Sequence, residues 1–193
     1  QGTSLSQHAQ ALALLFDIAP VERRRPLVGQ MLRNDIVQAT PYFMFYVLRA
    51  LDHTGYYQYA PDQMRRWKSM LDRGATTWLE EWENKRSWCH AWSSAPTYEL
   101  STRVLGVRPD APGFKKAVIE PFTAGLDWAK GTVPTPHGDI SVDWWQKGPR
   151  LHLNYSAPPG VAVDVRVPQG TVVVNRGPSA ARKAQNRKVK QEM

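Results

Sequence analysis

The chain contains one cysteine, Cys89, among its 193 residues. A single cysteine cannot form an internal disulfide, and it excludes a zinc site built from several thiolates. No apolar run approaches the roughly 18–20 residues that a membrane-spanning helix needs. No glycine-rich loop has phosphate-binding spacing, and the histidines are scattered along the chain. We therefore expect no cofactor, no metal ion and no membrane partner.

Negative charge is scarce near the C-terminus. Residues 176–193 hold six basic residues and one acidic residue, so +5 of the net charge of +8 lies there. The remaining net charge of +3 is spread over residues 1–175, and it does not indicate a nucleic-acid-binding domain. The sequence predicts a basic, disordered tail over 176–193 and no nucleic-acid partner.

The beginning of the sequence has neither a starting methionine nor a basic leader. Its first apolar residues recur at helical spacing, which favours a helix over a signal peptide. We therefore expect the chain to be a fragment or a processed product of a longer protein. The apolar fraction of 42% is high enough for a real core, and the charged fraction of 22% argues against general disorder.

The first half of the sequence has the apolar periodicity of helices. A hydroxyl residue followed by proline, Thr40-Pro41, is typical of a helix start, and Gly106 and Pro109 end the last helical segment. The predicted helices cover residues 5–16, 21–34, 40–55, 62–71 and 96–105. Short connections between them predict helical hairpins, and their aromatic inner faces indicate an incomplete bundle.

The second half changes to the alternating pattern of strands, separated by glycine and proline turns. The predicted strands cover residues 115–120, 126–133, 140–145, 151–155, 161–167 and 172–174. Closely spaced short strands predict an antiparallel β-sandwich over 114–175, joined to the helices by a linker over 107–113. Since neighbouring strand residues face opposite ways, one of Trp144 and Trp145 should lie in the core and the other outside. The fold class is thus α+β.

Tryptophan is concentrated in one short region, where five of the chain's eight indoles lie within 26 residues: Trp67, Trp78, Trp82, Trp88 and Trp92. Glu80, Glu81, Glu83 and His90 lie in the same window. Indole planes beside carboxylates suit a sugar, because the apolar face of a pyranose stacks on an aromatic ring while its hydroxyls need polar partners. The competing interpretation is ordinary core packing for the tryptophans and a solvated face for the glutamates.

Five segments of the sequence carry distinctive motifs: GATTWLEEW at 74–82, SWCHAWS at 87–93, VLGVRPDAPGFKKAVIEP at 104–121, GTVPTPHGDI at 131–140 and TPYF at 40–43. Together these segments resemble the bacterial α-L-rhamnosidases that have a six-hairpin (α/α)6 barrel. The resemblance extends over roughly residues 1–170. It implies that residues 1–106 are the C-terminal part of the barrel, with the β-sandwich following.

The resemblance further implies an inverting glycoside hydrolase that releases terminal α-L-rhamnose. Such enzymes place two carboxyl groups roughly 6.5–9.5 Å apart, one as general acid and one as general base that activates water. The family's base follows Gly-Ala-Thr-Thr, which corresponds to Glu80 here. Leu79 stands where the family often has tryptophan, so Glu81 is the second choice for the base. On an extended segment these two carboxylates would face opposite ways.

The resemblance also implies sugar-binding residues. His90 matches the family's sugar-contacting histidine, and Trp82 matches the aromatic residue beside the base, with Trp78 a further candidate in the same segment. Cys89, by contrast, is expected to be a buried small apolar residue rather than a nucleophile.

The family's general acid lies far upstream, and the acidic residues of 1–73 are isolated in ordinary helical contexts. We therefore expect this chain to carry the base, to need the missing N-terminal part of the same enzyme as its partner, and to be inactive alone on a rhamnose-containing carbohydrate. The alternative is a non-catalytic carbohydrate-binding or structural module derived from a glycosidase.

Overall fold

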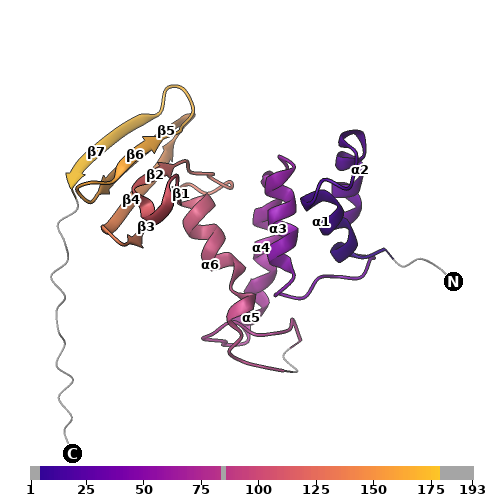
Figure 1. Ribbon diagram of the computed structural model, residues 1–193. Coiled ribbons are helices and arrows are strands. Elements are labelled where there is room, and N and C mark those ends of the chain that lie inside the picture. Colours follow the sequence, from indigo (N-terminus) through magenta and orange to yellow (C-terminus); the bar gives the residue numbers. More distant parts are fainter. Residues whose placement is uncertain (1–4, 84–85, 179–193) are drawn as a thin grey trace, which may run out of the picture. The chain divides into compact units, whose positions relative to one another are not determined.

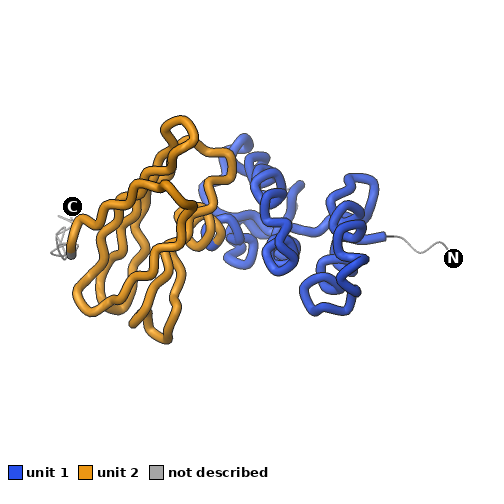
Figure 2. The backbone as a smooth tube through the Cα atoms, turned by 90° about the horizontal axis from the view of Figure 1, so that it is seen from above, with its two compact units in different colours: residues 1–98 blue, residues 99–193 orange. Residues whose placement is uncertain are grey.

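The computed structural model describes residues 5–83 and 86–178 (Figure 1). The chain divides into two compact units, residues 1–98 and 99–193, coloured separately in Figure 2. The first unit is helical and the second is built mainly of strands. No helix among residues 5–83 and 86–178 is both long and apolar enough to cross a membrane.

The first unit consists of short helices joined by turns and by longer loops. They are α1 (Gln7–Leu15), α2 (Val21–Met31), α3 (Met44–His53), α4 (Ala60–Met64), α5 (Lys68–Asp72) and the start of α6 (Ala95–Glu99), with 3₁₀ turns η1 (Tyr57–Tyr59), η2 (Arg65–Trp67) and η3 (Ala91–Ser93). The predicted helices over 5–16, 21–34 and 40–55 are confirmed with shorter ends, whereas the one predicted over 62–71 is divided into α4, η2 and α5. The helix expected from residue 40 begins at Met44 instead, after a turn in which the Met44 amide donates to the Thr40 carbonyl at 3.0 Å.

The core of the first unit forms where α3 packs against α1. The apolar stripe of α3 includes Val47 and Leu51, and that of α1 includes Leu14; all three are fully buried. Gln7 is also buried, and its amide joins three segments. Its Nε2 donates to the Met31 carbonyl at 2.9 Å and its Oε1 accepts from the Ala39 amide at 2.7 Å. A buried amide with both ends bonded avoids the cost of an unpaired polar group.

The second unit contains two sheets. Its strands are β1 (Val107–Pro109), β2 (Lys116–Ile119), β3 (Trp128–Thr135), β4 (Gly138–Lys147), β5 (Arg150–Ala157), β6 (Ala162–Val165) and β7 (Val172–Pro178), preceded by the π-helical turn η4 (Leu100–Val104), with the 3₁₀ turn η5 (Pro112–Phe114) between β1 and β2. One sheet has the order β1-β2-β6 and the other β3-β4-β5-β7. The predicted strands are present, and the β-sandwich class is confirmed.

Strand pairing in the sandwich is mixed, although the sequence predicted an antiparallel arrangement. β2 pairs with β6 and β5 with β7 in parallel, whereas the remaining three pairs are antiparallel. The reason is the path of the chain: after β5 it contributes β6 to the other sheet before returning as β7. A strand that returns after such a crossover can run parallel to its neighbour, unlike one joined by a hairpin.

Two segments differ from the sequence-based boundaries. Residues 107–109, within the expected linker, form β1, which pairs with the end of β2. β7 continues to Pro178, beyond the expected end of the strand set. The rest of the predicted tail, 179–193, lies outside the described residues.

The core of the sandwich confirms the prediction for the adjacent tryptophans. Trp144 is completely buried, and its Nε1 donates to the Val104 carbonyl at 2.9 Å. Trp145 lies on the opposite face of β4 and is half-buried. Because Trp144 binds the last residue of η4, the helical turn and the sheet form one packed body within this unit.

Candidate functional site

The predicted catalytic residues lie in the 74–90 loop, which joins α5 to η3. Its described residues, 74–83 and 86–90, contain no regular helix or strand. The described parts of this loop fold back on themselves. The Glu80 amide donates to the Ser87 carbonyl at 3.0 Å, and the His90 amide donates to the Trp78 carbonyl at 2.7 Å. The Thr77 hydroxyl also donates to the Trp88 carbonyl. The loop is therefore held by its own hydrogen bonds and brings residues 77–80 beside 87–90.

Trp82 attaches this loop to the helices of the same unit. Its Nε1 donates to the Ala39 carbonyl at 2.8 Å. Its ring meets Trp67 edge-on, with centroids 5.1 Å apart and planes at 77°. The Arg66 guanidinium lies over its face, 4.6 Å from the ring centroid. Such ring and cation contacts each contribute about 1 kcal/mol.

The partners of Trp82 are themselves fixed. Trp67 is buried, and its Nε1 donates to the Ser93 carbonyl at 2.9 Å. Arg66 also donates to the Met44 sulfur at 3.4 Å. Burial lowers the pKa of Arg66 because the charged guanidinium loses water contacts. Trp82 is therefore well anchored, and one face of its indole is occupied by a cation.

Glu80 and Glu81 share one cationic partner. Arg86 lies 3.6 Å from Glu80 Oε1 and 3.3 Å from Glu81 Oε1. The Ser87 amide also donates to Glu80 Oε2 at 3.3 Å. Both carboxylates are half-buried, with side-chain exposures of 28% and 31%. The backbone bends and turns at 80–83, so the extended segment that would have separated the two side chains does not form.

The neighbouring residues have distinct environments. Leu79, which replaces the family's frequent tryptophan, is buried, and Trp78 is half-buried. His90 is half-buried, with its ring 6.1 Å from that of Trp92. The prediction that Cys89 is buried is wrong, because the thiol is exposed on the irregular loop. Its segment packs by backbone hydrogen bonds and leaves this side chain outside the core.

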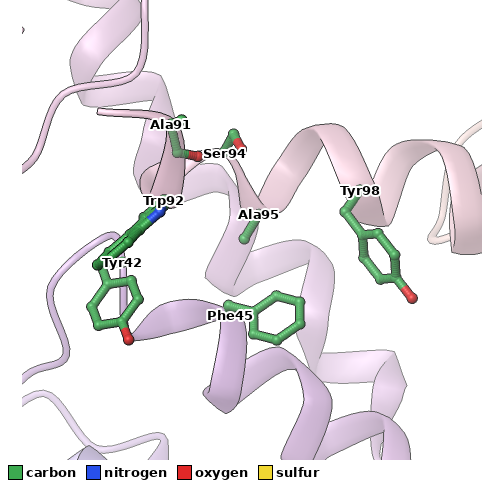
Figure 3. Close-up of a pocket in the computed structure, with 7 residues that line it drawn as sticks. All are labelled: Tyr42, Phe45, Ala91, Trp92, Ser94, Ala95 and Tyr98. Carbon is green, nitrogen blue, oxygen red and sulfur yellow. Dashed lines mark hydrogen bonds between the residues drawn. The ribbon is translucent and has the colours of Figure 1, made fainter. Parts of the chain in front are cut away.

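An aromatic cavity of about 450 Å³ lies beside η3 (Figure 3). Its lining rings come from two segments: Tyr42 and Phe45 from the turn before α3 and its first residues, and Trp92 and Tyr98 from η3 and α6. The Tyr42 and Trp92 rings contact each other, with centroids 5.4 Å apart. A hydrogen bond with Tyr46 raises the pKa of the Tyr42 hydroxyl. An open, ring-lined hollow of this size can accept the apolar face of a sugar.

The predicted site residues stand next to this cavity rather than in it. None of Glu80, Trp78 and Trp82 lines the cavity. The ring of His90 contacts Trp92, and Trp92 is one of the lining residues. Sequence analysis did not identify Phe45 and Tyr98 as lining residues. The Thr40–Phe43 motif and the tryptophan cluster were the two signals that pointed to this region.

Metal ligation has no structural basis in the part of the chain that the structure describes. There, no three residues among His, Cys, Asp and Glu come together in a group that could hold an ion. The chemical groups of the region thus include the Glu80 and Glu81 carboxylates, the guanidinium groups of Arg66 and Arg86, an imidazole, and a set of indole and phenol rings.

A helical-hairpin unit with a carboxylate loop, followed by a two-sheet sandwich, defines a class: six-hairpin glycosidase domains with a C-terminal β-domain. Residues 2–104 match the family model described as the bacterial alpha-L-rhamnosidase 6 hairpin glycosidase domain. Residues 106–182 match that of the bacterial alpha-L-rhamnosidase C-terminal domain. The chain belongs to the bacterial α-L-rhamnosidase family.

Individual relatives agree with this assignment. An α-L-rhamnosidase of Alteromonas sp. (strain LOR) is 31% identical over 136 residues, which is 64% of this chain and 14% of the relative. The crystal structure of a GH78 family rhamnosidase of Bacillus sp. GL1 is similar with a TM-score of 0.81 and 31% identity, covering 93% of this chain and 21% of that one.

A Streptomyces avermitilis α-L-rhamnosidase complexed with L-rhamnose has a TM-score of 0.70. Its 24% identity, over 84% of this chain and 18% of that one, shows a shared fold. This chain therefore spans about a fifth or less of the length of these relatives.

Proposed function

We propose that this chain is the general-base part of an inverting α-L-rhamnosidase that acts on rhamnose-containing carbohydrates. The observation that carries the proposal is the match of both family models, in order, over nearly the whole chain. The Alteromonas relative, named an α-L-rhamnosidase and 31% identical over the matched residues, supports the choice of sugar.

In this proposal Glu80 accepts a proton from water as that water attacks the anomeric carbon. The glycosidic bond breaks on the opposite side of the sugar ring, and the leaving oxygen takes a proton from a general acid. That acid is proposed to lie in a part of the enzyme that these 193 residues do not span. The complete reaction thus requires both parts of the enzyme.

Glu80 is a better candidate than Glu81 because its position is more closely determined. The Glu80 backbone amide donates to the Ser87 carbonyl, and the Ser87 amide donates to the Glu80 carboxylate. Two hydrogen bonds therefore join Glu80 to the opposite side of the folded loop. Among the described residues, the Glu81 carboxylate contacts Arg86 at 3.3 Å. A general base must be held within hydrogen-bonding reach of its water, so the more restrained carboxylate suits that role.

The rings beside Glu80 have proposed roles in binding. His90 would hydrogen-bond a sugar hydroxyl, and Trp92 with Tyr42 would take the apolar face of the ring in the aromatic cavity. The anchored Trp82 and the half-buried Trp78 would shape the wall next to the base.

The test uses the full-length enzyme with Glu80→Gln and, as the matched control, Glu81→Gln. Loss of a general base reduces kcat about 10²–10⁴-fold, and substrate affinity should change far less. Glu80→Ala should regain turnover of an activated aryl α-L-rhamnoside in azide, since azide attacks without losing a proton. Full activity of Glu80→Gln with loss in Glu81→Gln would assign the base to Glu81. Full activity of both would leave only a binding or structural role.

A further inference from the structure

The four-stranded sheet has an outer face that carries aromatic rings. Trp144 and Leu153 are buried, so the adjacent Trp145 and His152 point to the other side of the sheet. Trp145 pairs with Trp128 of β3 and with His152 of β5. These three residues, which we call the ring row, therefore stand side by side across three strands of the sheet labelled in Figure 1.

The ring row combines a fixed pair with a free ring. The Trp145 and His152 rings are stacked, with centroids 5.0 Å apart and planes only 9° from parallel. Trp128 is 67% exposed at the edge strand. The exposed Trp128 indole next to the stacked pair presents apolar ring surface on a rigid sheet. The apolar face of a pyranose packs against surface of this kind.

A polar hollow lies next to the ring row on the same face. Lys130, Asp143 and Asn154 are cross-strand neighbours two residues further along β3, β4 and β5. They line a cavity of about 250 Å³ together with Thr132, Ser141 and Arg176. A strand rises about 3.3 Å per residue, so the hollow begins about 7 Å from the ring row, roughly the length of one sugar unit.

Asn154 places a side-chain amide in the lining of this hollow. The residue is only 7% exposed and lies opposite Asp143 across the sheet. An amide offers both donors and an acceptor, which matches the hydroxyls of a sugar.

The charges of the hollow favour a saccharide over a phosphate-rich ligand. Arg176 lies 3.9 Å from Asp143, so one of the two cations lining the hollow is paired with the carboxylate. Lys130 is the second cation, and its ammonium group can bind one sugar hydroxyl or one sugar carboxylate. Asp143 would repel a polyanion.

We propose that this face of the sandwich is a second saccharide-binding site, separate from the loop that carries Glu80. One pyranose ring lies on Trp128, and the next ring of the chain places its hydroxyls in the polar hollow against Asn154 and Asp143. The site would hold a carbohydrate chain without acting on it, and it does not depend on the proposed catalytic role.

The test is an NMR titration of the ¹⁵N-labelled 193-residue chain with two probes, a neutral rhamnose–glucose disaccharide and a rhamnose–galacturonate disaccharide. We expect shifts of the Trp128 and Trp145 indole N–H signals and of the Asn154 side-chain amide. Trp128→Ala should weaken binding about tenfold, the upper range for loss of one aromatic contact. Lys130→Ala should weaken binding of the acidic probe alone.

Matched controls separate this proposal from the catalytic one. Trp92→Ala removes an equally exposed indole from the other unit, and Glu80→Gln removes the proposed base; neither should change binding at the sheet. Binding of either probe with this dependence supports the site. Absence of shifts with both probes, or weakening by Trp92→Ala but not by Trp128→Ala, would overturn it, whatever the outcome for Glu80.

Discussion

Gly106 offers a sharp test of how the second unit holds together. It ends η4 with a positive φ of 86°, and its carbonyl accepts from the Glu120 amide at 2.9 Å. A Cβ at this position would lie 2.4 Å from both the Glu120 carbonyl carbon and the Pro121 nitrogen. Both atoms are backbone, so no side-chain rotation can relieve the overlap.

The cost of Gly106→Ala has two parts. The left-handed conformation costs an alanine about 1–2 kcal/mol. Moving the backbone to relieve the overlap adds about 1–3 kcal/mol, as for other overpacked sites. The free energy of unfolding of this unit should therefore fall by about 2–5 kcal/mol, a large part of the 5–15 kcal/mol typical of a domain.

Gly170 supplies the matched control. Its φ of 84° is nearly the same, but a Cβ there would meet nothing within 4 Å. Gly170→Ala should therefore cost only the conformational part, about 1–2 kcal/mol. The difference between the two variants isolates the close approach of Gly106 to the chain after β2.

The appropriate assay is amide hydrogen exchange in the central strands β4 and β5, at Val142 and Leu153, because the two units can open separately. Protection should fall by about tenfold for each 1.4 kcal/mol lost. Gly106→Ala should thus lose about 5- to 140-fold more protection than Gly170→Ala, which is the 1–3 kcal/mol of overlap converted at this rate. Equal losses in the two variants would refute the reasoning.

Two further predictions concern the first unit. Trp82→Phe removes the bond to the Ala39 carbonyl and should cost about 1 kcal/mol, seen as faster proteolysis of the 74–90 loop in that variant but not in the control Trp92→Phe. Asp17 accepts from His53 at 2.9 Å and from Arg24 at 2.6 Å, and the hydrogen bond from His53 is the main cause that lowers its pKa. A lowered carboxylate pKa stabilises the fold above the ordinary value of 3.8, and this contribution is lost as pH falls through the lowered pKa. The urea midpoint of Asp17→Asn, which retains the tolerance for a positive φ, should therefore lie below that of the unaltered chain at pH 6 and converge with it in acid; a difference independent of pH would contradict this account.

The helices and strands were predictable because their periodicity is local. The alternation in VAVDVRV and the apolar spacing of α1 show which residues of each segment share an apolar face and which share a polar face, whatever the segment packs against. β1 was missed because its three residues, the last of them proline, are too few to show alternation. The burial of Trp144 rather than Trp145 depended on which face of β4 meets the core.

The candidate site was predictable only in part. The motif that ends at Glu80, and the indoles around it, could be read directly, and they led to the family that both models match. The ion pairs of Arg86 with both carboxylates could not be predicted, because they depend on a bend at 80–83 that leaves no periodic pattern in the sequence. The exposure of Cys89 was likewise a property of loop packing.

By itself, the order of residues determined the two halves and their element types, and it singled out the tryptophan cluster as the candidate site. Tertiary structure alone decided which indole anchors the 74–90 loop, why two strand pairs run parallel, and that the ring row and the polar hollow share one face. The physical reason is that apolar periodicity is a property of neighbouring residues, whereas these contacts join segments far apart in the chain. Such contacts depend on the path that the backbone takes between sheets and around turns.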